Sequence, residues 1–239
     1  MTTTFEVHPD VDAVAAATAD RLIAAGQNAM RRRGRFTVAL SGGSTPLAVC
    51  PLLVVPPRVR QLDWSRVEFL FGDERAVPPD HPDSNYRLAR EALLDYLPRL
   101  RMEQVHRMHA EEPDLDAAAR RYEDVLRARV AGRPGRAPAI DLIWLGMGAD
   151  GHTASLFPGS AALGERRRWV VGNWAPSIEA WRMTLTYPVL NAGREVIFVV
   201  TGAEKAAAVR AIRSGQGDLP AGRVRARRTR WILDAAAGG

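Results

Sequence analysis

The sequence predicts an α/β fold with a mainly parallel, open sheet and helices on both faces of that sheet. Short runs such as residues 36–40 and 140–145 are almost wholly apolar, which is typical of strands covered on both faces. These runs alternate with segments of helical periodicity, the pattern of right-handed βαβ units. The chain has 239 residues, 46% of them hydrophobic. This is enough for one full core, so we expect residues 1–239 to form a single domain.

The first predicted helix covers residues 11–33. Asp10 can cap its amino end, its interior is rich in alanine, and Gly34 can end it. The apolar segment at residues 36–40 follows at once and is expected to be the first strand. The α/β alternation is therefore predicted to begin with this pair.

A second helix is expected after the loop SGGSTP, since Pro46 suits the first turn of a helix. Three later prolines are expected to cut this helix short: Pro51, Pro56 and Pro57. The second strand is predicted at residues 67–71, followed by a loop rich in turn residues, GDERAVPPDHPDSN. Ser84 can then cap a helix over residues 86–97.

The second half of the chain is predicted to contain most of the strands. Asp114 can open a helix that stops at the Gly/Pro cluster of residues 132–138, and a short strand is expected near Val105. Gly202 introduces a helix over residues 203–213. The remaining strands are predicted at residues 140–145, 168–172, 182–187, 195–201 and 229–233.

The formal net charge of +6 fits a nucleic-acid partner, or a small anion such as a sugar phosphate. Composition alone does not separate these two. Lys205 is the single lysine among 33 basic residues. It marks either a place that needs a compact ammonium group or a chance survival in an arginine-rich chain.

Cysteine usage and hydropathy predict a cytoplasmic protein. Cys50 is the single cysteine, so no internal disulfide can form and a reducing compartment is expected. The amino-terminal residues lack a basic head with an apolar core, and no apolar stretch approaches the ~20 residues of a membrane span. We expect no membrane partner, and a monomer or weak homodimer.

Three loops are expected to meet in one crevice. SGGSTP, GDER and GMGADGH each follow a predicted strand directly. In an open α/β sheet, ligands bind outside the carboxyl ends of the strands. One ligand site is therefore predicted to collect residues from all three loops.

The SGGSTP loop is a candidate phosphate site. Its glycines, hydroxyls and the following helix start offer free N–H donors and a favourable dipole to an anion. It is not a Walker A loop, because GxxxxGK[ST] is absent. The same residues also serve a plain strand-to-helix turn, which stays open as an alternative. The candidate binding residues are Ser41, Gly42, Gly43, Ser44 and Thr45.

The GMGADGH loop is the strongest candidate for proton transfer. His152 has the side chain best suited to general acid–base work near neutral pH, and Asp150 is close enough in sequence to orient it. Glycines at Gly146, Gly148 and Gly151 let a ligand approach the main chain. A histidine that is merely packed is the alternative.

The triplet Asp73, Glu74 and Arg75 places two carboxylates beside a guanidinium, which either binds an anionic ligand or forms a solvated surface pair. No metal is expected, because His106 and His109 have no cysteine or HExxH motif near them.

The arginines from Arg223 to Arg230 form a basic run near the carboxyl terminus. Few aromatic residues are interleaved with them, and no helix-turn-helix or RNA-binding signature is present. We therefore interpret the run as solvated arginines and expect no nucleic-acid partner.

The motifs together resemble the 6-phosphogluconolactonase family over nearly the whole chain. The segments are ALSGGSTP, FLFGDERAVPPDHPDSNYRLAREALL, DLIWLGMGADGHTASLFPGS, WRMTLTYPVLNAGREVIFVVTGAEKAAAV, LPAGRV and WILDAAA. The resemblance implies the Rossmann-like fold that this family shares with glucosamine-6-phosphate deaminases. It also implies hydrolysis of 6-phospho-D-glucono-1,5-lactone in the oxidative pentose phosphate pathway, without a cofactor.

The resemblance assigns roles to individual residues. Lys205 falls at the family's sugar-phosphate lysine and Arg182 at the arginine that opens RMTLT, and both suit a phosphate. Our mechanistic hypothesis is that Arg75 contacts the sugar end or the phosphate and that His152 acts as general base, oriented by Asp150. Asp73 is expected to position water or sugar hydroxyls. Backbone N–H groups of the glycine loops are expected to hold the oxyanion. The chain departs from the family at CPLLVVPP, where relatives continue a regular helix.

Two other functions remain to be separated from the lactonase. A glucosamine-6-phosphate deaminase or isomerase would carry a glutamate before the proline of the histidine loop and an aromatic residue after the Asp-Glu pair. Here the loop runs SLFPG, and Arg75 follows the pair. A non-catalytic sugar-phosphate sensor on the same fold would need no Asp150 and His152 pair.

Overall fold

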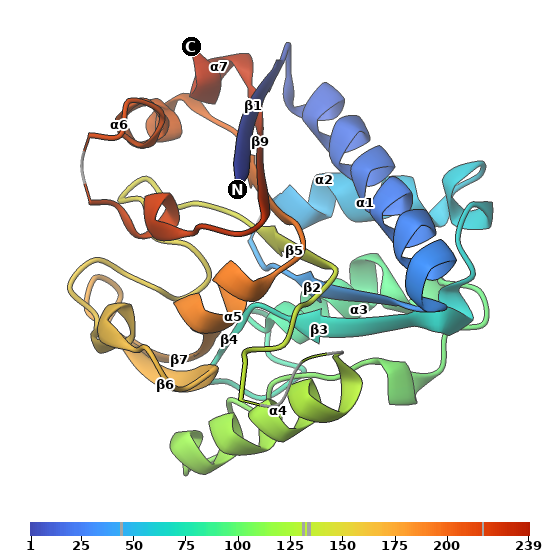
Figure 1. The fold of residues 1–239 in the computed structure, drawn as a ribbon, viewed down its shortest axis with the longest axis horizontal. Coiled ribbons are helices and arrows are strands. Elements are labelled where there is room, and N and C mark those ends of the chain that lie inside the picture. Colours follow the sequence, from blue (N-terminus) through green and yellow to red (C-terminus); the bar gives the residue numbers. More distant parts are fainter. Residues whose placement is uncertain (44, 131, 133–134, 217) are drawn as a thin grey trace.

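The main sheet consists of parallel strands in the order β1-β9-β8-β5-β2-β3 (Figure 1). The structure is a computed structural model that describes residues 1–43, 45–130, 132, 135–216 and 218–239. In sheet order the strands are β1 (Thr2–His8), β9 (Arg228–Asp234), β8 (Val196–Val200), β5 (Leu142–Leu145), β2 (Phe36–Leu40) and β3 (Val67–Phe71). The central strands β2, β5 and β8 are buried along their whole length, as their apolar sequences predicted.

Helices cover both faces of this sheet, which confirms the predicted α/β class. Figure 1 shows α1 and α2 together on one side, with α4 across the strands from them. The helices are α1 (Val11–Arg33), α2 (Thr45–Val54), α3 (Asn85–Ala92), α4 (Leu115–Arg129), α5 (Tyr187–Ala192), α6 (Ala206–Arg213) and α7 (Ala235–Gly238). One cluster of buried apolar side chains extends from Val14 to Ala237. No described helix is long and apolar enough to cross a membrane.

The predicted capping residues define both ends of α1. The Asp10 carboxylate accepts a hydrogen bond from Ala13 N at 2.8 Å, which satisfies a free donor of the first turn. Gly34 adopts φ 76° and donates to Met30 O at 2.9 Å. This left-handed cap suits glycine, which has no Cβ to clash. The helix prediction for residues 11–33 is confirmed.

The first strand is Thr2–His8, not Phe36–Leu40 as the sequence predicted. β1 pairs only with β9 among the described strands and is mostly exposed. An edge strand of this kind carries no continuous apolar run, so the hydrophobic pattern does not reveal it. Its Phe5 ring stacks on Trp231 with centroids 5.7 Å apart, which anchors the strand.

A second, antiparallel sheet stands beside the carboxyl ends of the main strands. Its order is β4 (Asp73–Arg75), β7 (Ala180–Leu185) and β6 (Val170–Ala175). The sequence placed residues 73–75 in a loop, because three residues are too few to show a period. The predicted strand 168–172 starts two residues before β6, and the predicted strand 182–187 starts two residues after the start of β7, a usual error at element ends.

Two helix ends and one short strand differ from the prediction. α2 continues through Pro51 to Val54, because Val49, Cys50 and Leu53 are buried and their packing outweighs one lost hydrogen bond. α3 ends at Ala92 and is followed by a 3-10 turn, Leu94–Tyr96. Val105 forms an isolated bridge with Phe69 rather than a strand. The short helices α5 and α7 were not predicted.

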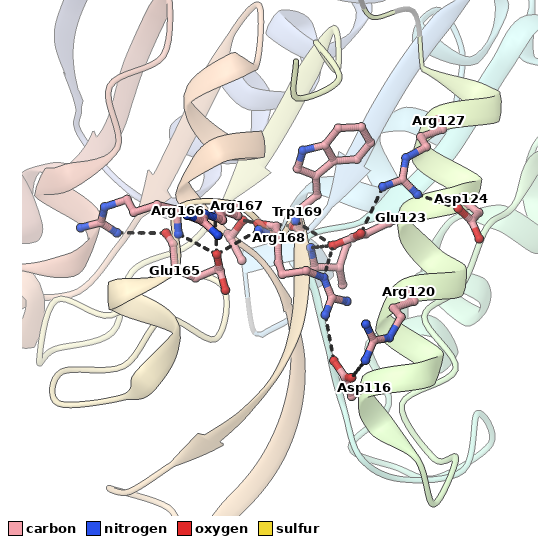
Figure 2. A network of polar contacts seen from close by, with 12 residues as sticks. Asp116, Arg120, Glu123, Asp124, Arg127, Glu165, Arg166, Arg167, Arg168 and Trp169 are labelled. Carbon is pink, nitrogen blue, oxygen red and sulfur yellow. Dashed lines mark hydrogen bonds and ion pairs between the residues drawn. The ribbon is translucent and has the colours of Figure 1, made fainter. Parts of the chain in front are cut away.

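A charged network fixes the small sheet to α4 (Figure 2). Glu123 Oε1 accepts hydrogen bonds from Arg168 Nε at 2.8 Å, Trp169 N at 2.8 Å and Val170 N at 3.1 Å. Arg168 Nη1 donates to Asp116 at 2.9 Å. These contacts hold the start of β6, and through it β7, against the body of the molecule.

Candidate active site

The carboxyl ends of four neighbouring strands, β8, β5, β2 and β3, meet at one edge of the main sheet. β3 lies on one side of β2 and β5 on the other. The loops after β2 and β5 therefore run to opposite sides, and a crevice opens between them at the carboxyl ends of these strands. A cavity of about 400 Å³ occupies this edge. The predicted site residues that line it are Ser41, Gly42, Gly43, Thr45, Asp73, Arg75, Gly148, His152, Arg182 and Lys205. Ser44 lies outside the described residues.

Asp150 holds the imidazole of His152 from behind the cavity lining. Its Oδ1 lies 2.6 Å from His152 Nδ1 and accepts from His152 N at 3.1 Å. Because an ionised carboxylate only accepts hydrogen bonds, Nδ1 carries the proton in this contact. Nε2 is then the nitrogen that can take a proton. The pair is partly exposed, at 30% for the His152 side chain and 39% for Asp150.

Two neighbours fix the position of the imidazole further. A Cβ at Gly148 would lie 2.2 Å from His152 Nδ1, so any other residue at this position would displace the imidazole. The ring of Phe157 stacks on the imidazole with centroids 4.2 Å apart and planes 26° from parallel. Gly148, which was expected to let a ligand approach the main chain, also leaves space for the His152 side chain.

Asp73 is buried, with 7% of its surface exposed. Its Oδ2 accepts from Ser155 Oγ at 2.6 Å, and its Oδ1 accepts from Asn85 Nδ2 at 3.3 Å. Both partners are neutral. No described arginine or lysine is in ion-pair contact with this carboxylate, which lies in the cavity wall.

Arg75 and Arg182 lie directly opposite each other on the antiparallel strands β4 and β7. Burial, and then the positive charge of Arg75, lower the pKa of Arg182. Neither guanidinium has a carboxylate in ion-pair contact among the described residues, although Arg75 Nη1 donates to Asn85 Oδ1. Like charges opposed across a strand pair are destabilising on their own. Such a pair is suited to bind an anion between its two cations.

Lys205 reaches the same cavity from the turn after β8. Its Nζ lies 3.7 Å from Glu204 Oε1, and its side chain is 21% exposed. The Glu204 side chain is far more exposed, at 63%, so this ion pair is solvated and weak. Lys205 thus adds a third cation to the cavity.

Asn85 and Glu74 connect α3 to the cavity. A Cβ at Gly42 would lie 1.6 Å from Asn85 Oδ1, so the glycine admits this amide. Glu74 accepts hydrogen bonds from Asn85 N at 2.7 Å and Tyr86 N at 2.8 Å, and thereby caps the start of α3. Burial raises the pKa of Glu74 even though these N–H donors act in the opposite direction. Of the carboxylates in the DER triplet, Glu74 is structural and Asp73 faces the cavity.

The sequence analysis did not identify several residues of the cavity. Asn85 follows the predicted cap Ser84, so the sequence placed it at the start of a helix. The sequence did not show that its side chain points into the cavity. Phe157 was noted only for the lack of an acid before the proline. The further lining residues are Met147, Ala154, Ser155, Ile178, Val199, Val200, Thr201 and Glu204. Ile178 comes from the β6–β7 turn, whose contact with the cavity depends on the unpredicted small sheet.

Three of the expected oxyanion donors in the GMGADGH loop are already in use. Gly148 N donates to His152 O, Gly151 N to Gly148 O, and His152 N to Asp150. These three N–H groups are therefore not available to a substrate oxyanion, which corrects that part of the prediction. The N–H groups of Gly42 and Gly43 have no acceptor among the described residues.

The remaining predicted features lie away from the cavity. Arg223 pairs with Asp218, and Arg230 with Glu6. His106 Nε2 lies 2.6 Å from Glu68 Oε2. Within the described part of the chain, no group of three or more His, Cys, Asp or Glu side chains is placed to hold a metal ion.

Comparisons with known proteins agree with this geometry. The family model "Glucosamine-6-phosphate isomerases/6-phosphogluconolactonase" matches residues 9–233. A 6-phosphogluconolactonase of Nostoc sp. is 40% identical, with 100% of this chain and 98% of the relative covered. That of Mycobacterium tuberculosis is also 40% identical, with coverages of 98% and 96%.

Solved structures show the same architecture. The 6-phosphogluconolactonase from Trypanosoma brucei has a TM-score of 0.86 at 28% identity, covering 99% of this chain and 97% of that chain. A monomeric glucosamine-6-phosphate deaminase has a TM-score of 0.79 at 19% identity, covering 99% and 98%. The second similarity concerns the fold alone.

Proposed function

The chain belongs to the family of glucosamine-6-phosphate isomerases and 6-phosphogluconolactonases, and on this premise we propose that it hydrolyses 6-phospho-D-glucono-1,5-lactone to 6-phosphogluconate. This reaction is a step of the oxidative pentose phosphate pathway. One observation carries the proposal: a single cavity contains an imidazole oriented by a carboxylate together with three cations that have few competing anions.

The cations bind the phosphate of the substrate. Arg182 and Lys205 supply the positive charge, and Gly42 and Gly43 supply free backbone N–H groups in the loop between β2 and α2. Arg75, opposite Arg182 on the small sheet, contacts the phosphate or the sugar end. An anion between these guanidiniums removes the repulsion that they exert on each other in the empty cavity.

His152 performs the proton transfers. Its Nε2 takes a proton from a water molecule as the water oxygen forms a bond to C1 of the lactone. The bond between C1 and the ring oxygen then breaks, and the imidazolium returns the proton to that oxygen, which becomes a hydroxyl group. Water is the nucleophile and imidazole the base, so the reaction needs no cofactor.

Asp150 and Asp73 have supporting roles in this proposal. Asp150 holds Nδ1–H, which fixes the tautomer with a free Nε2 and stabilises the imidazolium as it forms. Asp73, held by Ser155 and Asn85, presents its charge to water or the sugar hydroxyls. The ring of Phe157 keeps the imidazole plane in place while its charge changes.

The second candidate, a deaminase or isomerase, is supported by fold and family alone. In this chain Phe157 stands before Pro158 and packs on His152, so that position offers no carboxylate for amino-sugar chemistry. A sugar-phosphate sensor would not require the 2.6 Å contact between Asp150 and His152. The lactonase uses every one of these features.

We also propose an oligomeric state, a domain count and a cellular location for the protein. We place it in the cytoplasm as a monomer or weak homodimer, with residues 1–239 as one domain. A single apolar core from Val14 to Ala237 supports the single domain. The lone Cys50, which is buried and carries a pKa raised by burial to about 12, supports a reducing compartment without disulfides.

The test is a coupled assay on freshly prepared 6-phosphogluconolactone, corrected for spontaneous ring opening. We expect rapid formation of 6-phosphogluconate and no ammonia from glucosamine 6-phosphate. Release of ammonia would identify the deaminase. Saturable sugar-phosphate binding without either reaction would identify the sensor.

A further inference from the structure

A second cavity, of about 650 Å³, lies at the amino ends of the main strands, opposite the candidate active site. Seven arginines and two carboxylates, Asp141 and Glu195, line it. The arginines come from α1, from the turn before β8 and from the start of β9 with the residue before it. This concentration of guanidinium groups differs from the α4–β6 junction in Figure 2, where carboxylates accompany the arginines.

Asp141 is fully occupied by contacts inside the protein. Its Oδ1 lies 2.8 Å from Arg33 Nη2 and 3.2 Å from Arg194 Nε. Its Oδ2 accepts from Thr37 N at 3.0 Å and from Thr37 Oγ1 at 3.1 Å. The buried carboxylate therefore fixes two guanidinium groups at the cavity wall and leaves no oxygen free for a third.

Glu195 plays the same part for a second group of arginines. Only 2% of its surface is exposed, and Arg21 Nε donates to its Oε1 at 2.6 Å. Arg230 Nε and Arg228 Nε lie 3.6 and 3.8 Å from its carboxylate oxygens. One carboxylate thus serves three cations, and the cavity keeps a large excess of positive charge.

Arg31 and Arg227 add to this excess without any carboxylate of their own. Both are exposed, and neither takes part in an ion pair or side-chain hydrogen bond among the described residues. Arg32 has only the Asn28 amide oxygen as a partner, at 3.1 Å. A multiply charged anion in this cavity would contact the unpaired guanidinium groups of Arg31 and Arg227 beside guanidinium groups that the two buried carboxylates already hold in position.

We propose that this cavity is a second anion site that binds a compact oligophosphate. Several guanidinium groups around one cavity match the closely spaced oxygens of linked phosphates through forked hydrogen bonds. The lining includes arginine, asparagine, threonine, alanine and methionine but offers no described aromatic ring for a base to stack on. This favours an oligophosphate over single-stranded nucleic acid, which relies on such stacking.

The probe is inorganic tripolyphosphate, titrated calorimetrically into the full chain. The test variant is Arg31→Gln combined with Arg227→Gln, which leaves no buried carboxylate unpaired. The control is Arg60→Gln combined with Arg129→Gln: both positions are exposed, lie outside the cavity and change the net charge equally. Lys205→Ala serves as the active-site comparison.

We expect the test variant to bind tripolyphosphate at this cavity at least about tenfold more weakly, with binding by the control unchanged and lactonase activity unchanged in the test variant. Lys205→Ala should keep this binding and lose only a separate binding event at the active site. Equal losses in test and control variants would mean unspecific charge attraction and overturn the proposal. Loss only in Lys205→Ala would place the anion in the active site and also overturn it. Tighter binding of a single-stranded oligonucleotide than of tripolyphosphate would contradict the ligand class.

Discussion

Arginines at the α4–β6 junction and in the active-site cavity have opposite surroundings. Partial burial alone would lower the pKa of Arg168, but its hydrogen bonds to Glu123 and Asp116 raise it above the ordinary value (Figure 2). Arg182 is also partly buried, and there burial and the charge of Arg75 lower the pKa. The first guanidinium has carboxylate partners within the protein, and the second has none in ion-pair contact among the described residues.

The difference separates structural cations from ligand-binding cations. A guanidinium that is paired with carboxylates of the protein stabilises the junction of two elements. Its charge is already balanced, so it attracts an anionic ligand only weakly. A buried guanidinium without them lowers the stability of the empty protein, and an anionic substrate removes that cost on binding. Burial without a carboxylate partner, rather than residue type, therefore distinguishes Arg182 in a chain with 33 basic residues.

The largest effect is expected from His152→Ala, which removes the only histidine that lines the cavity among the described residues. The turnover number should fall about 10²–10⁴-fold, because general-base catalysis contributes that much, while KM changes little. His109→Ala, at an exposed histidine outside the cavity, is the matched control and should keep wild-type kinetics. Unchanged turnover in His152→Ala would remove this residue from the chemistry.

The comparison itself is tested by Arg182→Gln beside Arg168→Gln. The first should raise KM by about 10- to 100-fold, the effect of one or two charge-assisted hydrogen bonds, without loss of thermal stability. The second should leave KM unchanged and cost about 1–3 kcal/mol of unfolding free energy, because Glu123 loses a partner. Steady-state kinetics of both variants measure the change in KM, and thermal unfolding measures the change in stability. The reverse pattern would contradict our division of the arginines.

Substitutions of Lys205 are expected to change KM less than Arg182→Gln does. Lys205→Ala should raise KM substantially, and Lys205→Arg should raise it only a few-fold, since charge is kept but a planar fork replaces a compact ammonium. If Lys205→Arg matched the wild type, the single lysine would be a chance survival. If Lys205→Ala also matched it, the phosphate assignment would fail.

The smallest expected effect concerns Glu74, a buried carboxylate held by N–H donors rather than by arginines. Burial raises its pKa, so between its unfolded and folded pKa values the folded state binds more protons than the unfolded state. Stability from this group therefore falls as pH rises through that window. Unfolding curves of wild type and Glu74→Gln should diverge accordingly, with the wild type losing relative stability above the ordinary carboxyl pKa. Parallel pH profiles would show that Glu74 does not titrate in this way.

The sequence predicted the central strands and the loops at their ends more accurately than the edges of the molecule. Strands such as Val67–Phe71 are buried on both faces, so their apolar sequence defines them. β1 and the three-residue β4 are defined by partners far away in the chain, Arg228–Asp234 and Ala180–Leu185, which no local pattern contains. These two strands therefore form because of pairing with distant strands, which hydrophobic periodicity does not reveal.

The same distinction applies to the candidate site. His152 and Asp150 lie two residues apart, so their contact could be predicted from one loop. The opposition of Arg75 and Arg182 depends on the small sheet, and the cavity wall formed by Ile178 depends on it as well. Three of the loop's N–H groups were misassigned, because their acceptors, such as His152 O, depend on how the turn folds back on itself.

The central claim is that one cavity holds the phosphate and the reacting carbon at the same time. A crystal structure with bound 6-phosphogluconate tests it most directly. We predict the phosphate in contact with Arg182 and Lys205, and the new carboxylate within hydrogen-bond reach of His152 Nε2. A phosphate bound among the arginines at the amino ends of the strands, or a carboxylate remote from His152, would contradict the account.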